Sequence, residues 1–333
     1  MSKPYHLTHT QRLANWLGEA TLQQIMAASK DFYAPVPILN TPGNVFAYKG
    51  EAYGTIQGGT GFTSHSDMIA ERSAGKGQNL FFRKTGTLAV ANSHASLWNV
   101  GASPGAGGAP AAIAAGANPD NTTTGGLRQV DPSGSDTLHT TSSLVAATAA
   151  PNTLLLYDRL WHGSAVQHNT TSAQTISGTL TRYATTTSPG NFAFLEVTTI
   201  LGATAHNITM TYVDQSGNSA EAAAAVAAVA SSAVTRLPHA NWFLPVNAAD
   251  TGLRNITQIQ MSAASTGVSN VVIGHPIGYL PCLVANQMNY FDGILVPFGM
   301  EQVLTDACLA FLEIDKGTGA ATTYNGSIQL LSG

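Results

Sequence analysis

Apolar and polar residues alternate in short runs along most of the chain, and turn-forming residues separate these runs. Short strands separated by turn residues are typical of a sandwich or jelly roll. We therefore predict a mainly β fold. The predicted strands cover residues 45–48, 80–83, 87–90, 154–160, 175–183, 192–200, 207–213, 242–246, 256–262, 270–273, 294–298, 309–314 and 327–331.

Turn residues suggest how some of these strands connect. Asp214-Gln215-Ser216-Gly217-Asn218 is one turn signal, and Tyr324-Asn325-Gly326-Ser327 carries the Asn-Gly pair that type I′ hairpins favour. We expect strands 192–200 and 207–213 to form an antiparallel pair. Residues 220–234 are rich in Ala and have helical propensity, but they follow a turn signal inside a β region, so strand and loop is the favoured interpretation.

The apolar spacing becomes helical near the N-terminus. Thr8-His9-Thr10-Gln11 has the form of a capping box before a helix predicted from Arg12 to about Ser29. Its apolar side chains form two stripes displaced around the helix: Leu13, Trp16, Leu17 and Ala20, then Leu22, Ile25 and Met26. Two apolar faces imply two neighbours, so this helix either packs on its own domain or docks on another subunit.

Residues 99–127 contain Gly, Ala, Pro, Asn and Thr with almost no large side chains. Such a segment buries little surface to offset the entropy of ordering, so we expect a long surface loop or extended arm. It divides the chain into an N-terminal helix and β region for attachment to a partner (1–98), the Gly/Ala-rich arm (99–127) and a β-sandwich domain (128–333). The arm is either a flexible linker or a strap that crosses neighbouring subunits.

Charged residues are scarce, with 14 Lys plus Arg and 18 Asp plus Glu among 333 residues, where an ordinary domain carries about a quarter. A neutral surface is easily desolvated against a neighbouring subunit, which indicates an assembly component. The net charge of −4 and the absence of a basic cluster disfavour direct nucleic-acid binding. The sequence contains no apolar run of about 18 residues and no secretory signal at Met1 to His6, so we expect a non-membrane protein that is made in the cytoplasm.

No motif predicts an enzyme, a cofactor or a metal site. The Gly-rich stretch 50–61 lacks the Gly-Lys-Ser/Thr of a phosphate loop, and Gly163-Ser164 lacks the second glycine of a nucleophile elbow. The close histidine pairs, His6 with His9 and His162 with His168, lack companions at zinc-site spacing. Residues 131–136 are read as a turn, with a weak ion site as the alternative.

Cys282 and Cys308 lie in apolar settings and are expected to be buried, reduced thiols. Aromatic residues of the β region are expected in the core. The alternative is a glycan-binding face that contains Trp161 and Trp242.

Several segments between about residues 150 and 285 resemble virion structural proteins of tailed bacteriophages. The likeness is carried by Leu156-Tyr157-Asp158-Arg159-Leu160-Trp161-His162, Leu180 to Tyr183, Met210 to Ser219, Leu244 to Val246 and Asp250 to Arg254. The resemblance implies a β-sandwich and a non-enzymatic role in the virion, with capsid decoration or cementing as the expected task. A tail-tube, neck or spike subunit and a glycan-binding virion protein are the alternatives.

The expected partner is the major capsid protein or another virion protein. Because closed symmetry is common among homo-oligomers, a trimer is the expected state. For the assembly contacts we select the helix around Trp16 and Leu17 and the arm from Gly101 to Gly126. A large aromatic anchor and an arm that orders on binding both suit a subunit interface.

Overall fold

A computed structural model describes residues 44–48, 51–54, 62, 65–86, 93–184, 190–228, 236–238, 243–293, 301–314 and 321–333. The predicted helix at 12–29 lies outside these residues, as do the predicted strands at 87–90 and 294–298. Trp16, Leu17 and Trp242 also lie outside them.

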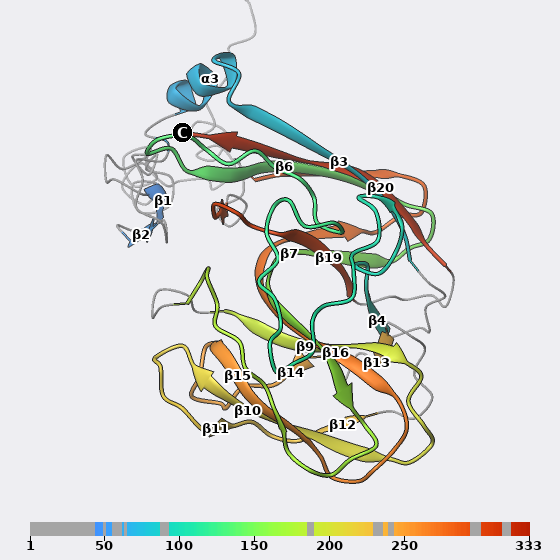
Figure 1. The fold of residues 1–333 in the computed structure, drawn as a ribbon. Helices are drawn as coiled ribbons and strands as arrows, with labels where there is room; N and C mark the ends of the chain where they lie inside the picture. Colours follow the sequence, from blue (N-terminus) through green and yellow to red (C-terminus); the bar gives the residue numbers. More distant parts are fainter. Residues whose placement is uncertain are drawn as a thin grey trace, which may run out of the picture.

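The described strands form three layers with antiparallel pairing throughout (Figure 1). The upper sheet has the order β17 (Met288–Asp292), β6 (Leu138–Ala147), β20 (Thr323–Ser332), β3 (Gly77–Thr85) and β5 (Ala102–Ser103), and β18 (Gln302–Val303) also pairs with β6. The middle sheet has the order β13 (Arg236–Pro238), β4 (Ser93–Ser96), β19 (Leu309–Ile314), β7 (Asn152–Gln167), β16 (Val268–Cys282), β9 (Phe192–Thr199) and β14 (Phe243–Leu244). The lower sheet has the order β11 (Glu221–Ala222), β10 (His206–Asp214), β15 (Leu253–Met261) and β8 (Gln174–Thr175), with β12 (Val226–Ala228) also on β10.

Two smaller elements complete the described structure. Helix α3 (His65–Ser73) lies on the outer side of the upper sheet, and β1 (Asn44–Tyr48) pairs with β2 (Glu51–Gly54) as a separate hairpin. The prediction of a mainly β, sandwich-like body is confirmed.

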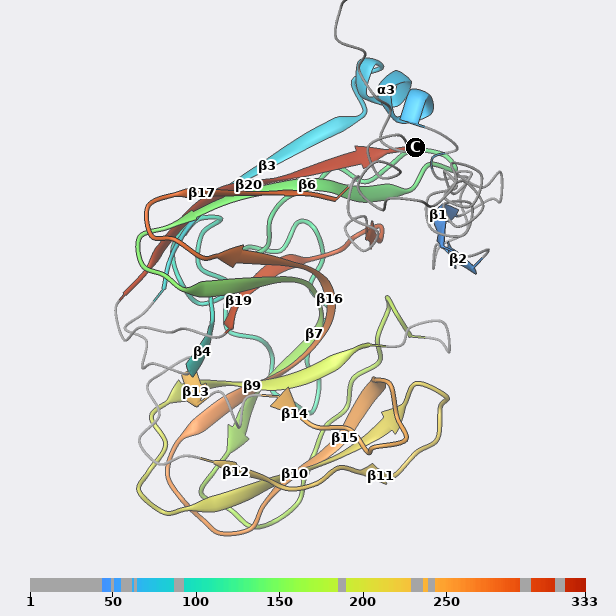
Figure 2. The same ribbon diagram turned by 180° about the vertical axis from the view of Figure 1, so that it is seen from behind.

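The middle sheet contributes side chains to two hydrophobic cores, because β7 and β16 are long enough to reach both (Figure 2). Leu154 and Leu156 join the core shared with the upper sheet, whereas Leu155 and Tyr157 join the core shared with the lower sheet. This alternation follows from the period of two along a strand. Register shifts at Ile273/Gly274 and Pro276/Gly278 interrupt the pairing of β16 with β7 between the two halves.

The predicted pairing of strands 192–200 and 207–213 is wrong. β9 pairs with β16 and β14 in the middle sheet, and β10 pairs with β15, β11 and β12 in the lower sheet. The chain therefore changes sheets between these two strands. Both strands turn apolar residues toward the same core, so their alternation could not distinguish neighbours in one sheet from partners across the core.

The predicted hairpin turn at residues 324–327 is also wrong, because these residues lie inside β20. Gly326 pairs with Phe82 on one side and Val145 on the other, and a Cβ atom there would collide with the carbonyl oxygen of Leu144. Glycine is thus needed for close packing in this strand and not for a turn. The predicted turn at Asp214–Asn218 is confirmed, since the amide of Asp214 donates to the carbonyl of Asn218.

Other sequence predictions differ in extent. Of the predicted strand 175–183, only the start is strand, at β8. Residues 221–222 and 226–228 are strands, as the strand-and-loop interpretation of 220–234 requires. The sequence patterns missed α3 and β6, whose first half is a polar run from His139 to Ser143.

Candidate functional site: a buried ionic centre and an exposed sheet face

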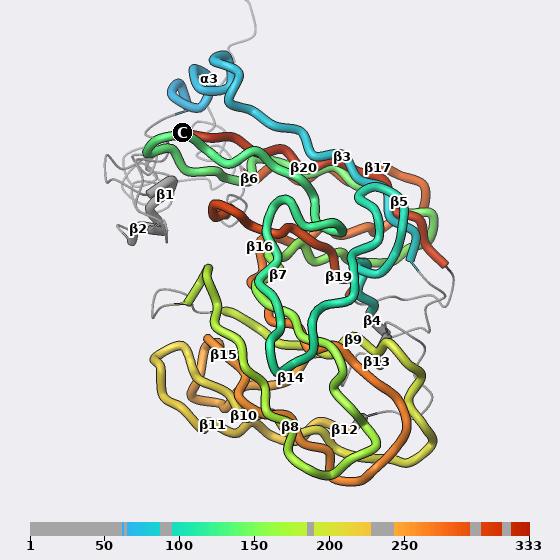
Figure 3. The backbone as a smooth tube through the Cα atoms, in the orientation of Figure 1, coloured from blue at the N-terminus to red at the C-terminus, as the bar shows by residue number. Residues whose placement is uncertain are grey.

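The Gly/Ala-rich segment 99–127 lies along the body of its own chain (Figure 3). The amide of Ile113 donates to the carbonyl of Ser164 at 2.9 Å, and the amide of Leu127 donates to the carbonyl of Leu309 at 2.8 Å. At the start of the segment, the buried Lys84 ammonium donates to the carbonyls of Val100 and Gly105. Backbone and side-chain contacts therefore hold the segment against β7 and β19 of its own subunit.

The glycines of this segment allow its backbone to lie on two indole rings. A Cβ atom at Gly107 would collide with Trp98, and one at Gly116 would collide with Trp161. Gly178, from a different loop, approaches Trp161 equally closely. Close contact between a backbone and a ring requires a residue without a side chain. The composition of the segment is thus explained by its packing.

The two glycines selected for assembly occupy different environments. Gly126 is buried, and a Cβ there would lie 2.8 Å from the Cys308 sulfur, so this residue is not accessible to a partner. Gly101 is exposed, and a Cβ there would meet nothing within 4 Å. Of these two glycines, Gly101 alone lies on the surface.

A bidentate ion pair lies at the centre of the middle sheet, between Arg159 on β7 and Glu196 on β9. The guanidinium nitrogens lie 2.7 and 2.8 Å from the two carboxylate oxygens, and both side chains have no solvent exposure. The Arg159 Nε donates to His162 Nδ1 at 2.9 Å, and the guanidinium carbon lies 4.4 Å from the centre of the Trp98 ring. Glu196 also accepts hydrogen bonds from Ser96 and Asn270.

These contacts set the charge states of the centre. Burial opposes ionisation of Glu196, but the Arg159 guanidinium beside it holds the pKa of this carboxyl below its usual range. Burial, together with the positive charge of Arg159, lowers the pKa of His162 to about 3. His162 is therefore neutral, and its Nδ1 is free to accept the hydrogen bond from Arg159.

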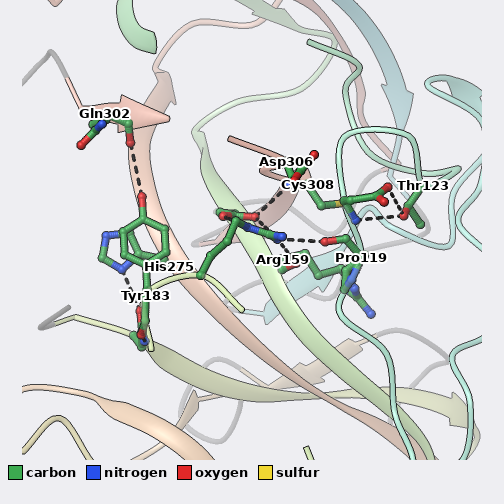
Figure 4. Close-up of polar contacts among 12 residues, drawn as sticks. Pro119, Thr123, Arg159, Tyr183, His275, Gln302, Asp306 and Cys308 are labelled. Carbon is green, nitrogen blue, oxygen red and sulfur yellow. Dashed lines mark hydrogen bonds and ion pairs between the residues drawn. The ribbon is translucent and has the colours of Figure 1, made fainter. Parts of the chain in front are cut away.

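A second ion pair lies next to the first, in the region around Pro119, Arg159 and Cys308 that Figure 4 shows. Arg182 donates to both oxygens of Asp158 at 2.8 Å, and its NH2 group also donates to the carbonyl of Pro119 at 2.9 Å. Asp158 accepts a further hydrogen bond from the amide of Cys308 at 2.8 Å. This pair links β7, the loop after β8, the segment 99–127 and the start of β19.

This ionic centre can stabilise the fold but does not face a substrate. Its charged side chains are buried, and each is paired in a geometry that satisfies both partners. Trp161 is 1% exposed and belongs to the core, so the hypothesis that its ring contributes to a glycan-binding face is wrong. Cys282 and Cys308 are buried free thiols, as predicted.

The outer face of the upper sheet offers the clearest exposed surface. Leu80 and Phe82 point into the core, so Phe81 between them points outward and is 73% exposed. Across the sheet, Phe81 pairs with Ser327, which pairs with Leu144, which pairs with Tyr290. Cross-strand partners share a face, so these four residues form one row with an exposed aromatic ring at each end.

A second row on the same face adds Met288, which is 61% exposed and pairs with Ala146. Helix α3 covers the other end of this face, where Met68 and Arg72 approach Gln329 and Leu331 around a pocket of about 610 Å³. We call the uncovered part, defined by Phe81, Leu144, Met288 and Tyr290, the outer apolar face. It was not predicted, because β6 and β17 were not recognised as strands.

Neither a membrane span nor a metal site is apparent in the described parts of the chain. No helix there is long and apolar enough to cross a membrane. No group of three or more His, Cys, Asp or Glu residues in the described ranges is placed to hold a metal ion.

No family model and no curated protein matches the sequence. Among solved structures, the chain is similar to the VP2 subviral particle of infectious bursal disease virus, with 9% identity, coverage of 77% of this chain and 80% of that chain, and a TM-score of 0.21. It is also similar to a structure of the Gt strain of that virus, with 10% identity, coverage of 77% and 80%, and a TM-score of 0.15. With TM-scores this low, the likeness establishes neither a shared fold nor a shared function.

Proposed function

We propose that this protein is a non-enzymatic structural subunit of a virus particle, and that it attaches to a neighbouring subunit through the outer apolar face. The observation that carries the proposal is the row from Phe81 to Tyr290, in which two large aromatic rings are exposed on an ordered sheet. Aromatic side chains are enriched at interfaces because they bury a large area at a low entropy cost.

The distribution of charge supports an assembly role. The chain has few charged residues, and several of them are buried: Lys84, Asp158, Arg159, Arg182, Glu196, Asp214 and Glu313. The surface is consequently even less charged than the composition suggests. A weakly charged surface costs less free energy to desolvate when subunits associate.

The finer role is that of a capsid decoration or cement protein of a tailed phage, bound to the major capsid protein as a homo-oligomer, with a trimer expected. This rests on the resemblance of residues 156–162, 180–183 and 210–219 to such virion proteins. The first two of those segments supply Asp158, Arg159 and Arg182, three of the four residues of the two ion pairs. The resemblance therefore lies in residues that hold the sandwich together.

The test is the copy number of the protein in the purified particle, relative to the major shell protein. Hundreds of copies in a simple ratio support decoration, a few to a few dozen copies move the protein to the neck, tail or spikes, and absence from the particle overturns the virion role. The double variant Phe81→Ser/Tyr290→Ser should lose incorporation. Ile200→Ser is the matched control, because Ile200 is 56% exposed in the connection between the middle and lower sheets.

A further inference from the structure

A cleft of about 470 Å³ lies between the upper sheet and the middle sheet, outside the outer apolar face. One side is formed by six consecutive residues of β16, from Pro276 to Pro281. The other side includes Ser143, Phe291 and Ile328 from strands of the upper sheet. The volume falls within the range of sites that hold ligands or short peptide segments.

The six consecutive lining residues show that the cleft follows the edge of the strand. Side chains alternate between the two faces of a strand, so a cavity against one face would be lined by every second residue. β9 pairs with β16 only as far as Gly274, whereas β7 pairs with it to Cys282. Beyond Gly274, β16 therefore pairs with β7 on one side and with no described strand on the other side.

The prolines at both ends fit an edge position. Pro276 and Pro281 have no amide hydrogen, and proline is found on edge strands where it does not interrupt a ladder. Between them, residues 277–280 each have a backbone amide and carbonyl; alternate residues direct these groups toward β7, and the others direct them toward the open edge. From Pro276 to Pro281 the edge spans about 17 Å, at about 3.3 Å per residue. An edge of this length that no described strand pairs with is a template for an added strand.

The charge in the cleft indicates what an added strand would carry. Among the described residues that line the cleft, Glu301 is the one with a charge, and none of them is Lys, Arg or His. Glu301 itself is an exposed residue, but the protein around its carboxyl group displaces water and raises its pKa to about 7. A positively charged neighbour would favour the ionised carboxylate.

We infer that this cleft binds an extended peptide segment of a neighbouring subunit, which pairs with residues 277–280 of β16 and places a Lys or Arg side chain beside Glu301. The inference rests on the proposed function for the source of the segment, since an assembly subunit meets neighbouring chains at fixed positions. Backbone pairing supplies affinity, and the side chain that meets Glu301 supplies selectivity.

The test uses the purified protein and a synthetic strand-forming peptide, acetyl-Val-Thr-Val-Lys-Val-Thr-Val-amide, with a fluorophore. Saturable binding is expected, about tenfold weaker for the peptide with Glu in place of Lys, since one ion pair of about 1.4 kcal/mol gives that ratio. A peptide with an N-methyl group on every residue should not bind, because neither of its edges can donate to the edge of β16. Absence of binding by the Lys peptide at 1 mM, or equal binding by the N-methylated peptide, overturns the inference.

Three variants locate the site. In Gly278→Phe the new Cβ meets nothing within 4 Å, so this variant is expected to fold and to block the cleft. Glu301→Gln should weaken binding of the Lys peptide about tenfold, whereas Glu221→Gln, on β11 of the lower sheet, should not. Binding that survives Gly278→Phe places the peptide elsewhere and also overturns the inference. Because these measurements need no particle, their failure is distinguishable from a failed incorporation assay.

Discussion

Arg159 and Glu196 form a bidentate ion pair that has no exposure to solvent, although 37 residues separate them in the sequence. Glu196→Gln should lower the free energy of unfolding by about 3–5 kcal/mol, because it leaves the guanidinium of Arg159 buried without a counter-charge. Urea denaturation of the original protein and of Glu196→Gln measures the difference in the free energy of unfolding.

The double variant Arg159→Met/Glu196→Leu is the control for this prediction. It removes both charges, so its loss of stability should be smaller than the sum of the losses for Arg159→Met alone and Glu196→Leu alone. If Glu196→Gln alone lowers the free energy of unfolding by less than about 1 kcal/mol, the ion pair does not stabilise the fold as its geometry indicates.

Two adjacent glycines test the packing of the segment 99–127. Gly107→Ala should destabilise the protein by about 1–3 kcal/mol, because the added Cβ collides with the buried Trp98 ring. Gly108→Ala is the matched control, since a Cβ there meets nothing within 4 Å. Thermal unfolding of both variants checks the prediction, and equal melting temperatures would contradict it.

Stability should fall when the pH is lowered from about 7 toward 5, because several histidines are buried in neutral form. Burial lowers the pKa of His139, His168 and His275 to about 4 each, and His162 is lower still. The unfolded chain takes up these protons near the ordinary pKa of about 6.5, whereas the folded chain does not. The stability they contribute is therefore complete above that value and is lost as the pH falls toward 4.

Each such histidine contributes a slope of about 1.4 kcal/mol per pH unit within this window. Urea denaturation at pH 7.5 and pH 5 measures the total. The stability of His168→Gln should depend less on pH, because this variant lacks one of the buried titrating groups. In the original protein, His168 is buried and hydrogen-bonded to His206 at 2.8 Å and to Ser269 at 2.8 Å. Identical stability of the original protein at the two pH values would refute the prediction.

The outer apolar face should contribute little to folding. Phe81→Ser and Tyr290→Ser should each change the free energy of unfolding by no more than about 0.5 kcal/mol, since both rings are more than half exposed. Leu80→Ser, one residue away but buried, should destabilise by several times as much. Denaturation of the three variants decides whether these neighbours differ as their orientation requires.

The fold class was predictable because short apolar segments separated by turn residues are typical of strands, and Leu154 to Leu160, Phe192 to Thr199 and Leu309 to Ile314 all lie in strands of the middle sheet. Pairing was not predictable, since β9 and β10 face one core from two sheets. Strand β6 escaped detection because its first residues are polar and yet buried. Their hydrogen bonds reach residues far along the chain, as between Thr141 and Gln329.

The outer apolar face could not be predicted because the pairing of the strands could not be predicted. The outer apolar face depends on the register of four strands, and two of these strands were not recognised. The ionic centre was present in the sequence as the segment from Asp158 to His162, but its partners Arg182 and Glu196 lie 24 and 37 residues from the residues that they bind. No local spacing reveals such a pair.

Strands β7 and β16 run without interruption from one hydrophobic core to the other. Force applied to the upper sheet would reach the lower sheet along two continuous polypeptide backbones that are hydrogen-bonded to each other over most of their length. Such a connection resists extension through covalent bonds and resists sliding through the strand pairing. Under a load that pulls on the two sheets, the two sandwiches would act as a single stiff element, without a hinge between them.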